Sequence, residues 1–210
     1  MFAPAAIAPA AIEVVLLAAG HSRRMGGVDK LQLDTGNGQS LLAGSITLYR
    51  ALGMAVTLVR RPDQPDLVDL CPELYPGPGL TIVTNHEPDA DQAASVRTGL
   101  AAAQLAGPGL LIALADQPWL TPADIAALVA TFASHGGARI IVPRHAGQRG
   151  NPVLLPVAAA RWLAAQPAAT PRGFIDANPD LVVWHEAAHD HFTRDIDTPA
   201  DAALLKDLAR

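Results

Sequence analysis

Three cationic side chains lie close together near the start of the chain: Arg23, Arg24 and Lys30. They follow an apolar run, residues 12–18, whose length and β-branched content predict a buried strand. Glycines interrupt the cationic stretch, beginning at Gly20, and leave backbone amides open to close approach. Amides and cations together suit a triphosphate, whose negative charge they offset. The alternative is a basic surface turn, but strand, glycines and lysine in this order favour a phosphate-binding loop.

Two common phosphate-binding loops are absent from this stretch. A Walker A loop places its lysine directly after a glycine, whereas Val28 and Asp29 separate the glycines from Lys30. The dinucleotide fingerprint G-x-G-x-x-G fails because Ser22 occupies the position of its second glycine. An oxidoreductase that binds a dinucleotide is therefore a poor interpretation.

The stretch from Leu17 to Lys30 instead resembles the signature of nucleotidyltransferases that act on small substrates, L-x-[AG]-G-x-S-x-R-M-G-x-x-K. It is most similar to the molybdenum cofactor cytidylyltransferases and the related MobA-like nucleotidyltransferases. The resemblance implies that Arg24 and Lys30 are catalytic and contact the triphosphate. It also implies nucleotide binding by these two residues and by Leu17, Ala18, Ala19, Gly20, Ser22 and Gly26.

The nucleotide base is left open by this loop. Residues 18–20, Ala-Ala-Gly, resemble the cytidylyl branch of the family. Residues 27–29, Gly-Val-Asp, stand where many cytidylyltransferases have a proline before the lysine, and are closer to the guanylyl branch.

Two downstream carboxylates are candidates for a Mg²⁺ site. Asp116 follows an apolar run and resembles the metal-binding acid of the family segment A-x-x-D-x-P, which implies a catalytic role. Residues 195–201 match the family segment D-I-D-T-P-x-D, from which Asp197 is the second expected ligand and Asp195 a weaker candidate. Two carboxylates with phosphate oxygens and water satisfy the octahedral demand of Mg²⁺. The alternative for Asp116 is an ordinary aspartate that caps a turn. The alternative for Asp197 is an acidic residue that stabilises the start of a helix without any metal.

Two further segments resemble family sites. In residues 91–100 the resemblance implies that Ser95 and Gly99 contact the nucleotide, although an acid or amide stands where a glycine is usual. Residues 147–153 resemble the family segment G-x-R-G-[HN]-P-V, which implies that Arg149 and Asn151 bind the acceptor. The alternative for the first segment is a helix with one polar face. The alternative for the second is a Gly-Pro hairpin turn.

The elements that must position these residues alternate between strands and helices. Apolar runs predict strands at residues 12–18, 54–60, 80–84, 110–115, 139–142, 151–155 and 181–184. Helices are expected at residues 40–52, 91–104, from 121 onward, 157–165 and 198–208. This alternation predicts a mostly parallel sheet covered on both faces, and ligands sit at the carboxyl ends of such strands. The resemblance implies a Rossmann-like three-layer α/β/α sandwich of the nucleotide-diphospho-sugar transferase type.

Length and composition bound the setting. The 210 residues suffice for one core, so we expect a loose tail over residues 1–10 and a single domain over residues 11–210. A net charge of −5 argues against nucleic acid as a partner, and no apolar stretch approaches a membrane span. The lone Cys71 favours a reducing cytoplasm. The spacing of His185, His189 and His191 could suggest zinc, but no cysteine or H-E-x-x-H helix accompanies them, so a zinc site is not expected.

The expected activity is transfer of CMP from CTP to the terminal phosphate of molybdopterin, with release of pyrophosphate and with Mg²⁺ as cofactor. The alternatives are GTP as donor, another small phosphorylated acceptor, or a carrier that delivers the cofactor to a molybdoenzyme without catalysis. The sequence does not identify the acceptor, the recipient enzyme or the oligomeric state.

Overall fold

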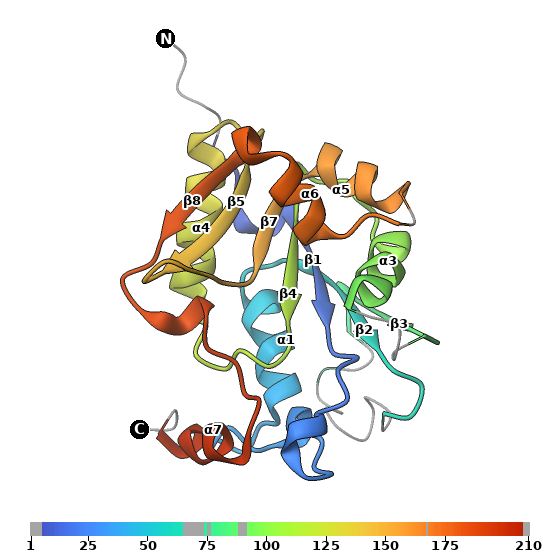
Figure 1. Cartoon of the computed structure of the whole chain (residues 1–210), viewed down its shortest axis with the longest axis vertical. Coiled ribbons are helices and arrows are strands. Elements are labelled where there is room, and N and C mark those ends of the chain that lie inside the picture. The colour runs from blue at the N-terminus through green and yellow to red at the C-terminus, as the bar shows by residue number, and fades with distance from the viewer. Residues whose placement is uncertain (1–5, 65–73, 75–76, 88–91, 167, 208–210) are drawn as a thin grey trace.

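Apolar runs of the sequence form the central strands of one eight-stranded sheet, seen in a computed structural model (Figure 1). The structure describes residues 6–64, 74, 77–87, 92–166 and 168–207. The strand order is β3-β2-β1-β4-β7-β5-β6, and β8 pairs with β5. The strands span Ile12–Leu17 (β1), Ala55–Arg60 (β2), Leu80–Thr84 (β3), Gly109–Leu114 (β4), Ile140–His145 (β5), Gln148–Arg149 (β6), Val153–Pro156 (β7) and Val182–Glu186 (β8).

Most strand pairs are parallel. β1 runs parallel to β2 and β4, β2 to β3, and β5 to β8. β7 runs antiparallel between β4 and β5, and β6 is antiparallel to β5. Leu17, the last residue of β1, is in register with Leu114, the last residue of β4. Because these parallel neighbours end together, the loops that follow them lie side by side.

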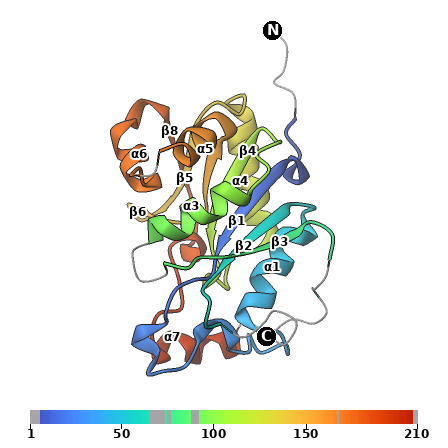
Figure 2. The same cartoon turned by 90° about the vertical axis from the view of Figure 1, so that its right-hand side faces the viewer.

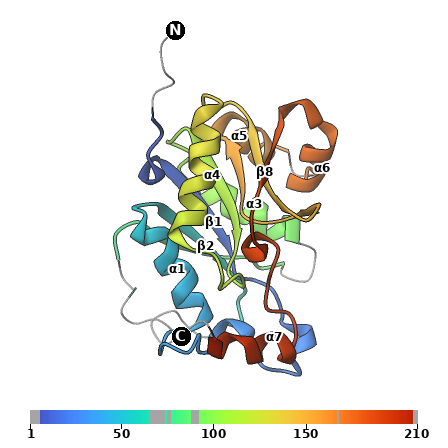
Figure 3. The ribbon, with the colours of Figure 1, turned by 90° about the vertical axis from the view of Figure 1, so that its left-hand side faces the viewer.

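Helices cover both faces of the sheet, as predicted. Helices α1 and α4 lie on one face (Figure 3), and α3, α5 and α6 lie on the other (Figure 2). The short helix α7 lies beyond the carboxyl ends of β1 and β4 (Figure 1). The helices span Leu41–Ala51 (α1), Gln92–Ala102 (α3), Pro122–Ser134 (α4), Val157–Ala164 (α5), Pro171–Ala177 (α6) and Pro199–Ala203 (α7). The architecture is therefore the expected three-layer α/β fold.

Alternating side chains of β1 divide the core into two halves. Val14 and Leu16 pack with residues of α1 and α4, whereas Val15 and Leu17 pack with residues of α3 and α5. Successive side chains of a strand point to opposite faces, so an apolar residue at every one of these positions requires cover on both sides. This double burial fixes β1 in the centre of the sheet and holds the loop after it in place.

Polar residues cap three helices where the sequence predicts helix starts. The Ser40 hydroxyl accepts a hydrogen bond from the Ala43 amide at 3.1 Å, at the first turn of α1. Thr121 begins α4 in a reciprocal capping box with Asp124, and Thr198 begins α7 in the same way. Such caps satisfy amides that have no partner within the helix.

Several elements differ from the prediction. The two-residue strand β6 and the short helix α6 are too brief to produce a periodic pattern, and neither was expected. The closing helix is shorter than predicted, because α7 passes into a 3₁₀ helix at Leu204–Asp207. Cys71, Asp91, Leu208, most of residues 62–78 and the first five residues of the expected tail lie outside the described residues. Among the described residues, no helix is long and apolar enough to cross a membrane.

Candidate active site

Lys30, in the predicted phosphate-binding loop, forms ion pairs with both predicted metal ligands. Its Nζ lies 2.6 Å from Asp116 Oδ2 and 3.0 Å from Asp197 Oδ1, although the three residues come from distant parts of the chain. The lysine is 8% exposed. Burial disfavours its charged form, but the two carboxylates outweigh burial and raise the pKa of Lys30. The ammonium group therefore stays charged at neutral pH and is held in one position.

Asp116 and Asp197 lie close together because a backbone hydrogen bond holds their two segments side by side. The amide of Ile196 donates to the carbonyl of Asp116 at 3.0 Å, and the Ile196 side chain is fully buried. Asp195 and Asp197 flank this anchored residue, so their carboxylates reach the side chain of Asp116. Arg24 adds a second cation, with Nη2 2.5 Å from Asp197 Oδ2.

The three carboxylates form a cluster that fits a hard divalent cation. One oxygen from each of Asp116, Asp195 and Asp197 lies within 4.8 Å of the others. Asp116 Oδ1 is buried and accepts no hydrogen bond from the part of the chain that the structure describes. A buried oxygen without a donor is costly unless a cation completes it, and carboxylate oxygens are the preferred ligands of Mg²⁺ and Mn²⁺.

The carboxylates also perturb one another. Burial raises the pKa of Asp195, and the negative charges of Asp116 and Asp197 raise it further. Like charges at this separation repel strongly, and Lys30 offsets only part of that repulsion. Such a cluster gains stability when a cation binds and loses affinity for the cation as pH falls.

Arg61 fixes the shape of the cationic loop, a role that the sequence analysis did not identify. Its Nη1 donates to the carbonyl of Gly20 at 2.5 Å and its Nη2 lies 2.9 Å from Asp29 Oδ2, at opposite ends of the loop. Gln64 accepts from the Arg61 amide and donates to the carbonyl of Ala18 at 2.8 Å. Residues 60–62 read only as the close of a strand, so no local signal marked this arginine.

Replacing Arg61 with Met is expected to lower the free energy of unfolding by about 3 kcal/mol, since it leaves the Asp29 carboxylate buried and unpaired. Urea unfolding measures the loss. The double variant Arg61→Met, Asp29→Asn removes the unpaired charge and should regain part of the stability. Equal stability of the single variant and the unmodified chain would contradict the clamp.

A pocket of about 540 Å³ lies at the carboxyl ends of β1 and β4. Most of the residues predicted to bind nucleotide or metal line it: Leu17, Ala18, Ala19, Gly20, Ser22, Arg24, Lys30, Ser95, Asp116 and Asp197. Arg23 and Asp195 line it as well. Ser22 has a left-handed backbone, with φ of 50°, and its hydroxyl accepts from the Lys30 amide at 3.2 Å.

Two predicted nucleotide contacts lie elsewhere. Gly26 ends the 3₁₀ helix Arg23–Met25 in a left-handed conformation and is not among the described residues that line the pocket. Gly99 packs α3 against the sheet: a Cβ there would lie 2.3 Å from a methyl carbon of Val15. The structure thus gives Gly99 a packing role, while Ser95 on the same helix lines the pocket.

A second pocket of about 680 Å³ adjoins the first and holds the predicted acceptor residues. Arg149 and Asn151 line it, and the two pockets share Leu17, Gln92 and Leu114. Arg149 forms an ion pair with Asp176 of α6, an element that sequence reasoning missed. Its guanidinium also lies over Trp184, 5.2 Å from the ring centroid.

The sequence matches a family model for the MobA-like NTP transferase domain over residues 14–181, most of the chain. The chain belongs to this family. One relative, from Natronomonas pharaonis, carries the name probable molybdenum cofactor guanylyltransferase. It is 28% identical over 196 residues, which cover 89% of this chain and 93% of the relative. The chain is thus a nucleotidyltransferase of the MobA-like kind.

Solved structures of similar proteins have the same fold. A homologue of Mycobacterium tuberculosis rv0371c from Mycobacterium sp. strain JC1 is 24% identical, with a TM-score of 0.72, over 96% of this chain and 98% of that one. The M. tuberculosis H37Rv protein, solved as a complex with manganese, is 22% identical, with a TM-score of 0.65, over 93% and 97% of the two chains.

Proposed function

We propose that this protein transfers a nucleoside monophosphate, CMP from CTP, to the terminal phosphate of molybdopterin. The observation that carries the proposal is the position of Lys30. It lies between Asp116 and Asp197 in one pocket, and that pocket shares lining residues with a second one lined by Arg149. A triphosphate and a phosphorylated acceptor could therefore meet at the boundary of the two pockets.

The reaction is an in-line displacement. An oxygen of the acceptor phosphate forms a bond to the α-phosphorus of the nucleotide, and the bond from that phosphorus to the bridging oxygen breaks. The bonding electrons leave with pyrophosphate. The acceptor phosphate is already an anion at neutral pH, so no side chain has to remove a proton from it.

The protein contributes alignment and charge. Lys30 and Arg24 would contact phosphate oxygens of the nucleotide, and the loop that Arg61 clamps would direct its amides at the same group. Asp116 and Asp197 would hold Mg²⁺, with Asp195 beside them. When bound, the ion offsets charge that develops on the phosphates. The manganese complex of the mycobacterial protein supports a divalent cation in a relative.

The donor base has two candidates. Residues 18–20 resemble the cytidylyl branch, which favours CTP, whereas the relative from N. pharaonis is named a guanylyltransferase, which favours GTP. Incubation with molybdopterin, Mg²⁺ and an equimolar mixture of CTP, GTP and ATP, followed by mass spectrometry of the product, decides between them. Removal of the cation with EDTA should stop product formation, and Mg²⁺ or Mn²⁺ should restore it. Absence of pyrophosphate release with any nucleotide would favour a non-catalytic carrier.

Replacing Arg149 with Ala should raise the KM for the acceptor about tenfold, because a hydrogen bond to a charged phosphate is lost. The KM for the nucleotide should not change. Steady-state kinetics with each substrate varied in turn measures both. Asp176→Asn is the matched control, since it removes the same ion pair but keeps the guanidinium. If only the KM for the nucleotide changed, Arg149 would contact the nucleotide and not the acceptor.

A further inference from the structure

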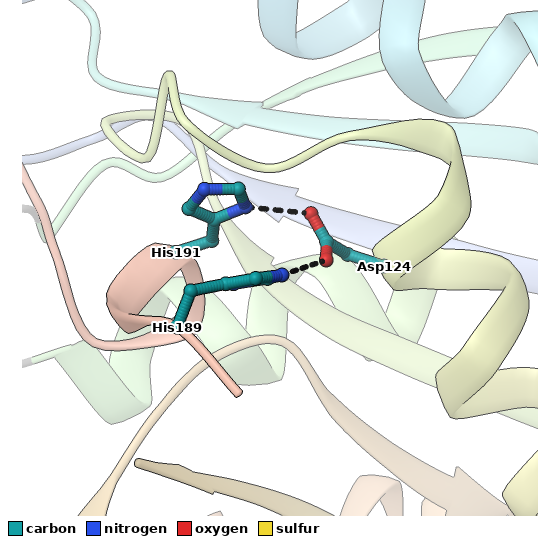
Figure 4. A group of neighbouring side chains, drawn as sticks. All are labelled: Asp124, His189 and His191. Carbon is teal, nitrogen blue, oxygen red and sulfur yellow. Dashed lines mark hydrogen bonds and ion pairs between the residues drawn. The ribbon is translucent and has the colours of Figure 1, made fainter. Parts of the chain in front are cut away.

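A second cluster of metal-ligating side chains lies outside the pockets described above. Figure 4 shows two imidazoles that point at the carboxylate of Asp124, which is almost fully buried at the start of α4. His189 Nε2 lies 3.3 Å from Asp124 Oδ1, and His191 Nδ1 lies 3.0 Å from Asp124 Oδ2. The two rings are tilted against each other, with centroids 3.7 Å apart and an interplanar angle of 31°.

We propose that Asp124, His189 and His191 bind a Zn²⁺ ion at a site separate from the carboxylate cluster. The three side chains supply two nitrogens and one oxygen, a ligand set typical of zinc with a position left for water. The ligand atoms lie within 4.8 Å of one another. His185, the third histidine of this region, does not join them, because its Nδ1 lies 2.9 Å from the hydroxyl of Thr131.

The separations suit a metal polyhedron. Ligand atoms roughly 2.1 Å from an ion lie about 3.0 Å apart at octahedral angles and about 3.4 Å apart at tetrahedral angles. The distance from His189 Nε2 to Asp124 Oδ1, 3.3 Å, is close to the tetrahedral value, whereas the 3.0 Å contact of His191 Nδ1 is to the other carboxylate oxygen, Oδ2. Asp124 Oδ2 also accepts hydrogen bonds from the amide and the hydroxyl of Thr121, at 2.8 and 2.7 Å. Oδ1 is therefore the oxygen that would bind the ion while Oδ2 keeps the helix cap, and a rotation of His191 would bring its Nδ1 to the same ion. His189 is 45% exposed, which leaves a path for the ion from solvent.

The two clusters should select different ions. Imidazole nitrogen favours Zn²⁺, Co²⁺ and Ni²⁺, whereas the three carboxylates of the pocket favour Mg²⁺ and Mn²⁺. The sequence argued against zinc at these histidines, because their spacing fits no zinc motif and Asp124 is 67 positions from His191, so only the structure brings the three together. Excess Mg²⁺ therefore should not displace zinc from the histidines.

A bound ion would tie the segment after β8 to α4. The 3₁₀ helix Asp190–Phe192 carries His191, and the carbonyl of Phe192 accepts hydrogen bonds from Gln117 Nε2 and from the amide of Asn151. The same segment continues to Asp195 and Asp197. The expected effect of zinc is thus a more stable attachment of the segment that carries two of the pocket carboxylates.

Metal titration of the purified chain tests the site, with Mg²⁺ in excess to occupy the carboxylates. Calorimetry should give one equivalent of Zn²⁺, and Co²⁺ should produce visible absorption bands. At a hundred times the Kd, Zn²⁺ should raise the Tm by about 5–10 °C. The double variant His189→Gln, His191→Gln keeps hydrogen-bond donors but removes both imidazoles, and should weaken Zn²⁺ binding at least about tenfold.

His135→Gln is the matched control, because this exposed histidine lies at the opposite end of α4 and should leave Zn²⁺ binding unchanged. If the double variant unfolds at a lower temperature without metal, the single variant His189→Gln provides the comparison. The proposal is overturned if Zn²⁺ binds equally well to the imidazole variants, if it is displaced by Mg²⁺, or if the unmodified chain binds none. In that last case the trio is only a hydrogen-bonded cap of α4.

Discussion

Asp116→Asn should lower the rate of pyrophosphate release by about a hundred- to a thousand-fold while the chain stays folded. The variant keeps the size of the side chain but removes the negative charge that faces Lys30 at 2.6 Å. It also replaces a carboxylate whose Oδ1 is buried and without a donor among the described residues. Both changes weaken the binding of a divalent cation at the cluster, so the affinity for Mn²⁺ should fall together with turnover.

Asp180→Asn is the matched control for this variant. It makes the same chemical change at an exposed aspartate in the 3₁₀ helix Pro179–Leu181. Turnover is followed by pyrophosphate release, Mn²⁺ binding by calorimetry, and folding by urea unfolding. If Asp116→Asn retained nearly full activity with an unchanged Mn²⁺ affinity, the metal site and the proposed chemistry would both be wrong. If activity fell with no change in Mn²⁺ binding, Asp116 would act without the metal.

That the loop beginning at Gly20 and Asp116 lie together could be predicted because each follows a buried parallel strand. Lys30 stands well beyond the end of β1, and the resemblance to the family signature assigned it to the site. β1 and β4 are parallel neighbours that end in register, and each has the apolar run of a doubly buried strand. A residue soon after either strand must lie at the same edge of the sheet. The position of Asp197 does not follow from the strands, since it depends on a backbone hydrogen bond from Ile196 to Asp116. Only the resemblance to a family segment indicated it.

Other parts of the site could not be predicted because long-range side-chain contacts build them. Arg61 reaches back to Gly20 and Asp29 from the end of β2, and nothing in its own neighbourhood marks such a contact. Gly99 matches a binding motif, yet the close approach of α3 to Val15 of the sheet is enough to require a glycine there. A glycine motif records the need for a small residue and does not record whether a ligand or another side chain requires it.

Lys30→Met should separate the two roles of this lysine by moving two measurements in opposite directions. Loss of the ammonium group from the phosphates should lower kcat by about a hundred- to a thousand-fold. In the chain without nucleotide, the same loss leaves three neighbouring carboxylates with less opposing charge, so Mn²⁺ affinity should rise about tenfold. Asp116→Asn lowers both quantities, so the pair of variants distinguishes a phosphate-binding cation from a metal ligand.

The stability of Lys30→Met should depend on metal in a way that the unmodified chain does not. Without divalent cation, repulsion among Asp116, Asp195 and Asp197 should lower the Tm, and Mn²⁺ should restore it. The raised pKa of Lys30 keeps the ammonium group charged throughout the neutral range, so the gain in Mn²⁺ affinity should be the same at pH 7 and at pH 8. Arg139→Met removes an exposed cation immediately before β5 and controls for net charge. An Mn²⁺ affinity that is unchanged in Lys30→Met would mean that the lysine does not compete for the carboxylates, and that the cation and the ammonium group occupy separate parts of the pocket.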